Sequence, residues 1–109
     1  MANTNFPIFL AEVDVAEFQA FRFQLPPQDI GRNDILIYVE YDRTEHGIVH
    51  YNAWGQFKDT YIRSFLVSSS ISLSTGTKDV VSKIIFDLNS SDIFYEQVHS
   101  FIDHFGRSR

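Results

Sequence analysis

The sequence predicts an α+β fold: a three- to four-stranded antiparallel meander with two C-terminal helices on one face. An N-terminal helix or strand is expected at the other face or at the edge. Two observations support this class, a strand-like alternation over residues 34–73 and two later stretches with helical spacing. At 109 residues with 44% hydrophobic content, the chain is long enough to bury a core as a single α+β domain, residues 1–109.

The meander begins at Asp34, where β-branched and aromatic residues dominate as far as Tyr41. Residues 42–47 are polar and end in a glycine, so they predict a hairpin loop. A second strand follows over residues 48–54. A turn near Lys58 and Asp59 then leads into a third strand that starts at residue 61.

The register of this hairpin decides which side chains share a face, because a slip of one residue exchanges the two faces. Placing Val39 opposite Val49 gives one apolar face made of Ile35, Ile37, Val39, Tyr41, Val49, Tyr51 and Ala53. The opposite face then holds Leu36, Tyr38, Glu40, His50, Asn52 and Trp54, and a two-residue turn adds Arg63, Phe65 and Val67. A register shifted by one residue would bury His50 and Asn52 without partners, which is unfavourable.

The N-terminal third fits two structures. Asp14 and Glu17 have the spacing of a capping box, which predicts a helix from about Asp14 to Gln24, ended by the prolines at 26 and 27. The alternation of Phe21, Phe23 and Leu25 fits a strand instead. Helix is our prediction, and the strand remains the alternative.

Two helices are predicted after the meander. Thr77 would cap the first, whose apolar face is Val80, Val81, Ile84, Ile85 and Leu88. The second begins after the polar residues 89–91 and ends at Gly106, with an apolar stripe of Phe94, Val98, Phe101, Ile102 and Phe105.

Composition narrows the classes of function. A net charge of −5 without a basic stripe argues against nucleic-acid binding. No apolar run reaches the length of a membrane span and there is no cysteine, so we expect a soluble, cytoplasmic protein without membrane contact. His99 and His104 are five residues apart and do not share a helical face, so we expect neither a metal nor a cofactor.

One candidate site on the second face consists of polar side chains. The predicted register makes Tyr38, Glu40 and His50 cross-strand and diagonal neighbours, with Asn52 beside them. A histidine near a carboxylate and a phenol can act as a general base, or the group can line a ligand site. An ordinary solvated sheet face is the favoured explanation of these residues, because no nucleophile or oxyanion donor accompanies them. No catalytic residue is predicted.

The second candidate is aromatic. Trp54 is expected to pair with Arg63 across the strands, and Tyr38, Tyr61 and Phe65 extend the patch. Three covers are conceivable, in this order: the N-terminal helix, a second subunit in a dimer, or a partner or ligand.

The leading hypothesis for function is a non-enzymatic protein that binds another protein, as an inhibitor, immunity-type neutraliser or adaptor. Its expected partner-binding residues are Trp54, Arg63, Tyr38 and Phe65, together with Glu12 and Glu17 of the acidic N-terminal third. A homodimer is the alternative assembly. The alternative function is a small-molecule-binding domain or small enzyme using Tyr38, Glu40, His50 and Asn52.

Overall fold

The computed structural model describes residues 8–15, 18–25, 27–44, 47–73 and 79–106. Within these ranges, five antiparallel strands form one sheet in the order in which they follow along the chain. The strands are β1 (Ile8–Val15), β2 (Phe18–Gln24), β3 (Ile35–Arg43), β4 (Ile48–Phe57) and β5 (Arg63–Ser72). The helices are α1 (Pro27–Ile30), α2 (Val80–Asn89) and α3 (Asp92–Phe105). The α+β meander with two C-terminal helices is therefore confirmed.

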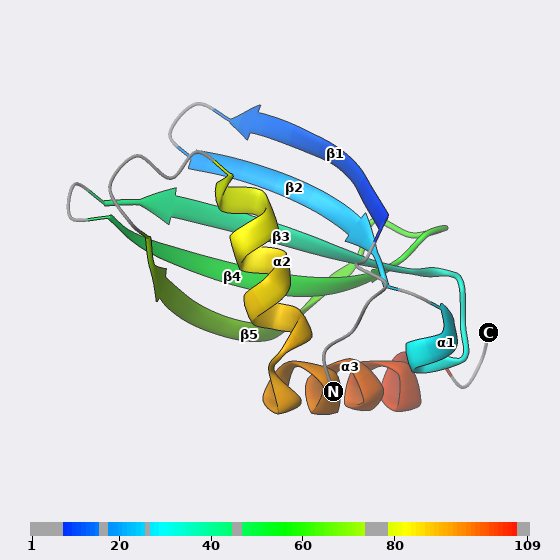
Figure 1. Cartoon of the computed structure of the whole chain (residues 1–109). Helices are drawn as coiled ribbons and strands as arrows, with labels where there is room; N and C mark the ends of the chain where they lie inside the picture. The colour runs from blue at the N-terminus through cyan, green and yellow to red at the C-terminus, as the bar shows by residue number, and fades with distance from the viewer. Residues whose placement is uncertain (1–7, 16–17, 26, 45–46, 74–78, 107–109) are drawn as a thin grey trace.

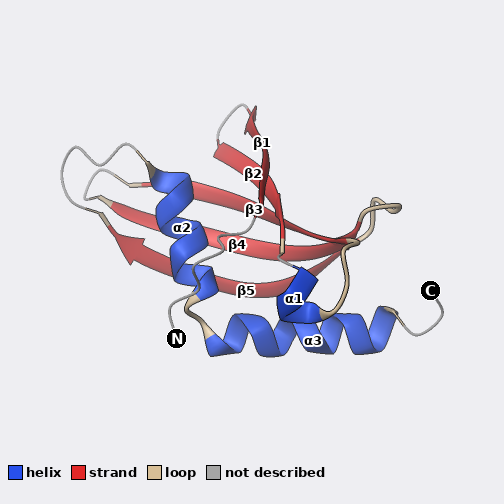
Figure 2. Cartoon of the chain, turned by 45° about the vertical axis from the view of Figure 1, so that its right-hand side comes forward, coloured by secondary structure: helices blue, strands red, loops and turns tan. Residues whose placement is uncertain are grey.

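The helices lie on one side of the sheet. Figure 1 shows α2 lying across β3, β4 and β5, while α3 runs below β5, and the turned view in Figure 2 shows the same arrangement. Asp79 caps α2 by accepting the backbone N–H of Ser82, and Ser91 caps α3 by accepting that of Phe94. The cap predicted at Thr77 lies outside the described residues.

The predicted helical stripes are confirmed except at the end of α3, where Phe105 is 47% exposed, while Val81 and Ile102 are partly buried. Val80, Ile84, Ile85 and Leu88 of α2 are buried, as are Phe94, Val98 and Phe101 of α3. They cover a sheet face that includes Phe21, Phe23, Ile35, Ile37, Val39, Tyr41, Val49, Tyr51 and Ala53. This is the hydrophobic core of the protein.

The prediction of a helix from Asp14 to Gln24 is wrong. This stretch contains the end of β1 and the whole of β2, and β2 pairs with β3 through Phe21 opposite Val39 and Phe23 opposite Ile37. The alternating aromatic residues of β2 are fully buried on the face that the helices cover. Burying two phenylalanines on an existing sheet outweighed the local preference of the capping-box residues. The N-terminal segment therefore extends the sheet at its edge.

The register of the β3–β4 hairpin differs from the predicted one by four residues. Val39 lies opposite Ala53, and Val49 lies opposite Arg43. The strand continues through Asp42 and Arg43, and the turn closes where Thr44 donates its backbone N–H to Ile48, at 2.8 Å. Because four is an even number, every side chain keeps its predicted face.

The β4–β5 pair contains a bulge. Trp54 lies opposite Phe65, whereas Ala53 lies opposite Val67, so Leu66 is an additional residue on β5. Leu66 is buried, and Gln97 of α3 donates to its carbonyl oxygen at 3.3 Å. The bulge also turns Val67 toward the core, which corrects its predicted place on the opposite face. The five residues 58–62 that join the strands replace the predicted two-residue turn.

Helix α2 is fixed to the sheet by one part-buried hydrogen bond. The Tyr51 hydroxyl, on β4, donates to Oδ2 of Asp87 at 2.6 Å. Burial, followed by this bond and the negative charge of Asp87, raises the pKa of Tyr51 above its ordinary value of 10.0. Tyr51 therefore stays protonated and remains a donor well into the alkaline range.

Replacing Tyr51 by phenylalanine tests this bond. We expect Tyr51→Phe to lower the free energy of unfolding by about 1.5 kcal/mol at neutral pH, because a hydrogen bond to a charged group is lost. A raised pKa in the folded state stabilises fully below the ordinary value and is lost as pH rises, so wild-type stability should fall faster than that of the variant above pH 10.0. Urea titrations across pH measure both. Tyr61→Phe, whose side chain is 97% exposed, should follow the wild type.

Helix α3 packs closely against β4 at Gly55. A Cβ on Gly55 would lie 3.0 Å from Cδ2 of Phe101, which is closer than normal contact. We therefore expect Gly55→Ala to destabilise the protein by about 1–3 kcal/mol through overpacking. A double-mutant cycle in urea checks the cause. In a Phe101→Leu background the effect of Gly55→Ala should shrink, and an equal effect in both backgrounds would rule out this contact.

Candidate functional site

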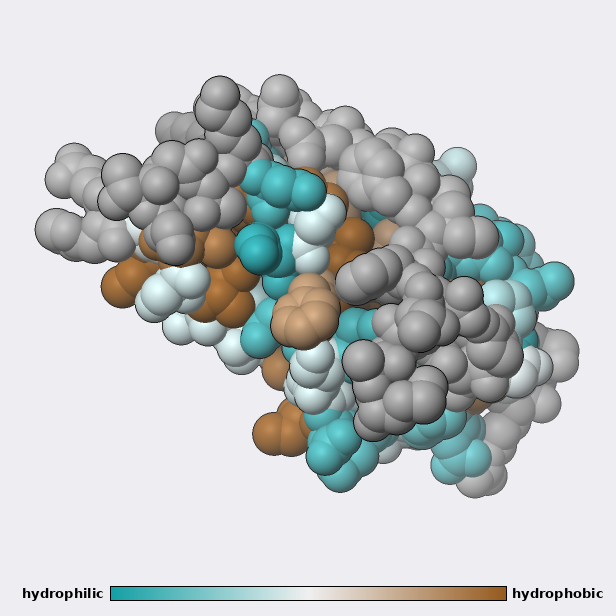
Figure 3. Space-filling model, in the orientation of Figure 1, coloured by the Kyte–Doolittle hydropathy of each residue, from teal (hydrophilic) through white to brown (hydrophobic). Residues whose placement is uncertain are grey.

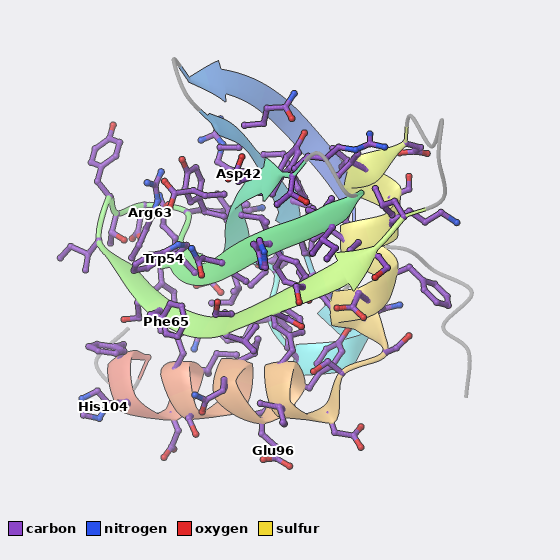
Figure 4. The ribbon with its side chains drawn as sticks, turned by 90° about the vertical axis from the view of Figure 1, so that its left-hand side faces the viewer. Asp42, Trp54, Arg63, Phe65, Glu96 and His104 are labelled. Carbon is purple, nitrogen blue, oxygen red and sulfur yellow. The ribbon has the colours of Figure 1, made fainter. Side chains whose placement is uncertain are left out.

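The candidate site is the sheet face turned away from α2 and α3, here called the outer face. It is made of the alternate side chains of β2 to β5 that do not enter the core, including Arg22, Tyr38, Glu40, Asp42, Asn52, Trp54, Gln56, Arg63 and Phe65. Figure 4 shows Arg63, Trp54 and Phe65 together on the side of the sheet opposite α2. Within the described part of the chain, no helix covers this face. The predicted cover by an N-terminal helix is therefore wrong.

One row of side chains crosses the outer face. Arg22 lies opposite Tyr38, Tyr38 opposite Trp54, and Trp54 opposite Phe65. Trp54 and Phe65 contact edge to face, with ring centroids 5.4 Å apart. Such cross-strand aromatic contacts stabilise a sheet and hold the rings in fixed positions.

Arg63 is held in place by two neighbours. Its guanidinium carbon lies 3.6 Å from the centroid of the Tyr38 ring, and its Nε donates to Oε1 of Gln56 at 3.0 Å. Gln56 is only 5% exposed and donates in turn to the carbonyl oxygen of Thr60, at 2.6 Å. The predicted cation–π contact of Arg63 therefore exists, but with Tyr38 instead of Trp54.

The Tyr38 hydroxyl stays neutral at physiological pH. Burial raises its pKa most, and the charge of Glu40 raises it further, while Arg63 and Arg22 act in the opposite direction. The outer face thus keeps two positive side chains beside a neutral phenol.

Trp54 carries an unusual donor. Its indole N–H is buried and has no hydrogen-bond partner among the described residues. An unpaired buried donor opposes folding. The edge-to-face contact of Trp54 with Phe65 acts in the opposite direction and stabilises the folded state.

Exposed apolar side chains border the row at the β4–β5 connection. The exposed fractions are 97% for Tyr61, 75% for Ile62 and 51% for Phe65. Tyr61 and Ile62 directly precede Arg63 in the chain, and Phe65 follows it by two residues. Ile62 was not predicted, because an isolated isoleucine before a strand carries no periodic signal.

The predicted polar group is divided by the actual register. Glu40 and Asn52 are direct neighbours, but Tyr38 lies opposite Trp54 and His50 lies opposite Asp42. The predicted pairing of His50 with Tyr38 is therefore wrong, because the strands pair four residues further along, whereas His50 remains a diagonal neighbour of Glu40. Asp42 was not predicted as a site residue because β3 is longer than expected. Arg22 was not predicted because β2 was expected to be a helix.

The two acidic residues predicted to bind a partner come from the N-terminal third of the chain. Glu12 lies within β1, and Glu17 falls outside the described residues. The described residues contain no group of three or more histidine, aspartate or glutamate side chains that could hold a metal ion. None of their helices is long and apolar enough to cross a membrane.

Comparison with known proteins adds no relative: no family model matches the chain, and searches of curated proteins and of solved structures found no match. Any function must therefore be inferred from the outer face itself.

Removing Arg63 should loosen this face. We expect Arg63→Ala to lower the free energy of unfolding by about 1–2 kcal/mol, because the Tyr38 stack is lost and Oε1 of buried Gln56 loses its donor. Urea denaturation measures the change. Lys58→Ala, at an exposed position in the nearby turn, is the control and should change stability by less than about 0.5 kcal/mol. Equal effects would show that the Arg63 contacts contribute nothing.

Proposed function

We propose that this protein acts by binding another protein through its outer face, without catalysing a reaction. The observation that carries the proposal is an aromatic and arginine-rich sheet face, centred on Trp54, that lies on the side of the sheet opposite α2. Folded chains usually bury such a face under a helix or a second sheet. Here α2 and α3 both pack against the opposite face of the sheet.

The residue types fit a binding surface between proteins. Tryptophan, tyrosine and arginine dominate the energetically important centres of protein interfaces. Trp54, Tyr38 and Arg63 occupy adjacent positions, and the more polar Glu40 and Asn52 lie next to them. This arrangement resembles an apolar interface core with a polar rim.

The face is also ordered before any partner arrives. Stacking and a hydrogen bond hold Arg63, and the edge-to-face contact holds Trp54 and Phe65. Side chains that are already fixed lose less entropy on binding, so more of the contact energy appears as affinity. Preorganisation therefore supports recognition as the role of this face.

Binding is favoured over catalysis by the separation of His50 from Tyr38, which lies opposite Trp54. An acid–base site needs its titratable groups within hydrogen-bond distance of one another or of the substrate. We therefore infer an inhibitor, neutraliser or adaptor. Its lack of cysteine fits the reducing cytoplasm as the place of action.

Two exposed phenylalanines allow a matched test. Phe65 on the outer face is 51% exposed, and Phe86 on α2 is 57% exposed. Phe86 serves as the control because it lies on α2, on the opposite side of the sheet. Figure 3 shows this side, where hydrophilic residues lie between the hydrophobic ones. We expect affinity capture from the native host to retain a specific protein with the wild type and with Phe86→Glu. Phe65→Glu should lose it, since a charge would enter the apolar centre.

Quantitative mass spectrometry of the captured proteins is the measurement, with circular dichroism to verify folding. A partner that Phe65→Glu retains and Phe86→Glu loses would place the interface on the helices and contradict the proposal.

A further inference from the structure

We propose that the outer face is occupied by the outer face of a second copy, in a two-fold symmetric dimer with the two sheets packed face to face. The inference rests on the proposed function, because it takes the outer face to be a protein-binding surface and names its occupant. It is carried by the distribution of charge along β3.

The two ends of the outer face differ in charge. At one end the Arg63 guanidinium lies over the Tyr38 ring, with Arg22 on the neighbouring strand. Toward the other end, β3 presents Glu40 and then Asp42 on the same face. Asp42 is exposed and takes part in no ion pair among the described residues. Each end therefore carries a charge that the opposite end could neutralise.

A two-fold axis in the plane of the interface, perpendicular to the strands, brings opposite ends together. Tyr38 and Asp42 are four residues apart, which is about 13 Å along a strand. With the axis midway between them, the Arg63 guanidinium of each copy faces Asp42 of the other. Two symmetric ion pairs then form. Glu40 lies beside Asn52 close to the axis and faces its own copy, a repulsion that the two ion pairs must outweigh.

The size and character of the face suit such a dimer. Its four strands, about 4.8 Å apart and about 25 Å long, give a face of roughly 500 Å² in projection. The side chains raise the accessible area toward the ~800 Å² that each partner typically buries. Trp54 and Phe65 supply apolar area within it. Two twisted sheets pack in this way with their strands about 30° apart.

The decisive experiment is charge exchange, followed by sedimentation equilibrium of the full chain over a wide range of concentration. The wild type should be a dimer. Arg63→Glu should dissociate it, because the new carboxylate would face Asp42 of the other copy, and Asp42→Arg should dissociate it for the converse reason. Combining both substitutions in one chain should restore the dimer, as should mixing the two single variants. Both cases recreate pairs of opposite charge.

Glu96→Arg is the matched control, because Glu96 is exposed on α3, away from the outer face (Figure 4). The Glu96→Arg variant should form the same dimer as the wild type. Circular dichroism and thermal unfolding of every variant separate loss of association from loss of folding. Restoration by the double variant cannot arise from unfolding.

Two results would overturn the inference: a wild type that is monomeric throughout, or a dimer that resists both single substitutions. In the first case, capture of a different protein that depends on Phe65 would leave the proposed function standing with another occupant. If Phe65→Glu also captures every protein that the wild type does, the proposed function fails as well.

Discussion

The two-residue period of β3 and β4 is the constraint on which the rest of the structure depends. Because their side chains alternate without interruption, one face of the sheet collects Ile37, Val39 and Ala53 while the other collects Tyr38 and Trp54. The apolar face requires a cover, and α2 and α3 provide it. Once both helices are used there, the outer face has no described helix left to cover it. The core and the candidate interface are thus two consequences of the same alternation.

The bulge at Leu66 adjusts this pattern in one place. It lets Phe65 stay beside Trp54 on the outer face while Leu66 and Val67 both turn toward the core. The carbonyl oxygen of Leu66 accepts a hydrogen bond from Gln97, so the irregularity also attaches α3 to the edge of the sheet. Without the extra residue, Val67 would occupy the outer face. The aromatic row therefore owes its composition to a local irregularity that one side-chain hydrogen bond helps to stabilise.

Much of this fold follows from the sequence, and the failures have identifiable causes. The faces of β3 and β4 were predicted correctly although their pairing was not, since an error of four residues preserves parity. The pairing itself depends on where the turn closes. Aspartate is uncommon in strands, so its residue type did not indicate that β3 continues through Asp42. The local spacing of Asp14 and Glu17 indicated a helix. The conformation of Phe21 and Phe23 is instead determined by pairing with β3, which is distant in the sequence. Local signals cannot report that partner.

The candidate site was harder to predict than the core for the same reason. Tyr38, Trp54, Arg63 and Phe65 were all identified, because aromatic residues on the second face stand out in any register of the same parity. Which of these side chains are in contact depends on the offset between strands. Arg63 was therefore predicted to stack on Trp54, but it stacks on Tyr38. That change has a functional meaning. Arg63 over Tyr38 lies in line with the acidic residues of β3, whereas Arg63 over Trp54 would lie on the neighbouring strand. The opposite charges on this face are therefore aligned along one strand, and the proposed two-fold dimer depends on this alignment.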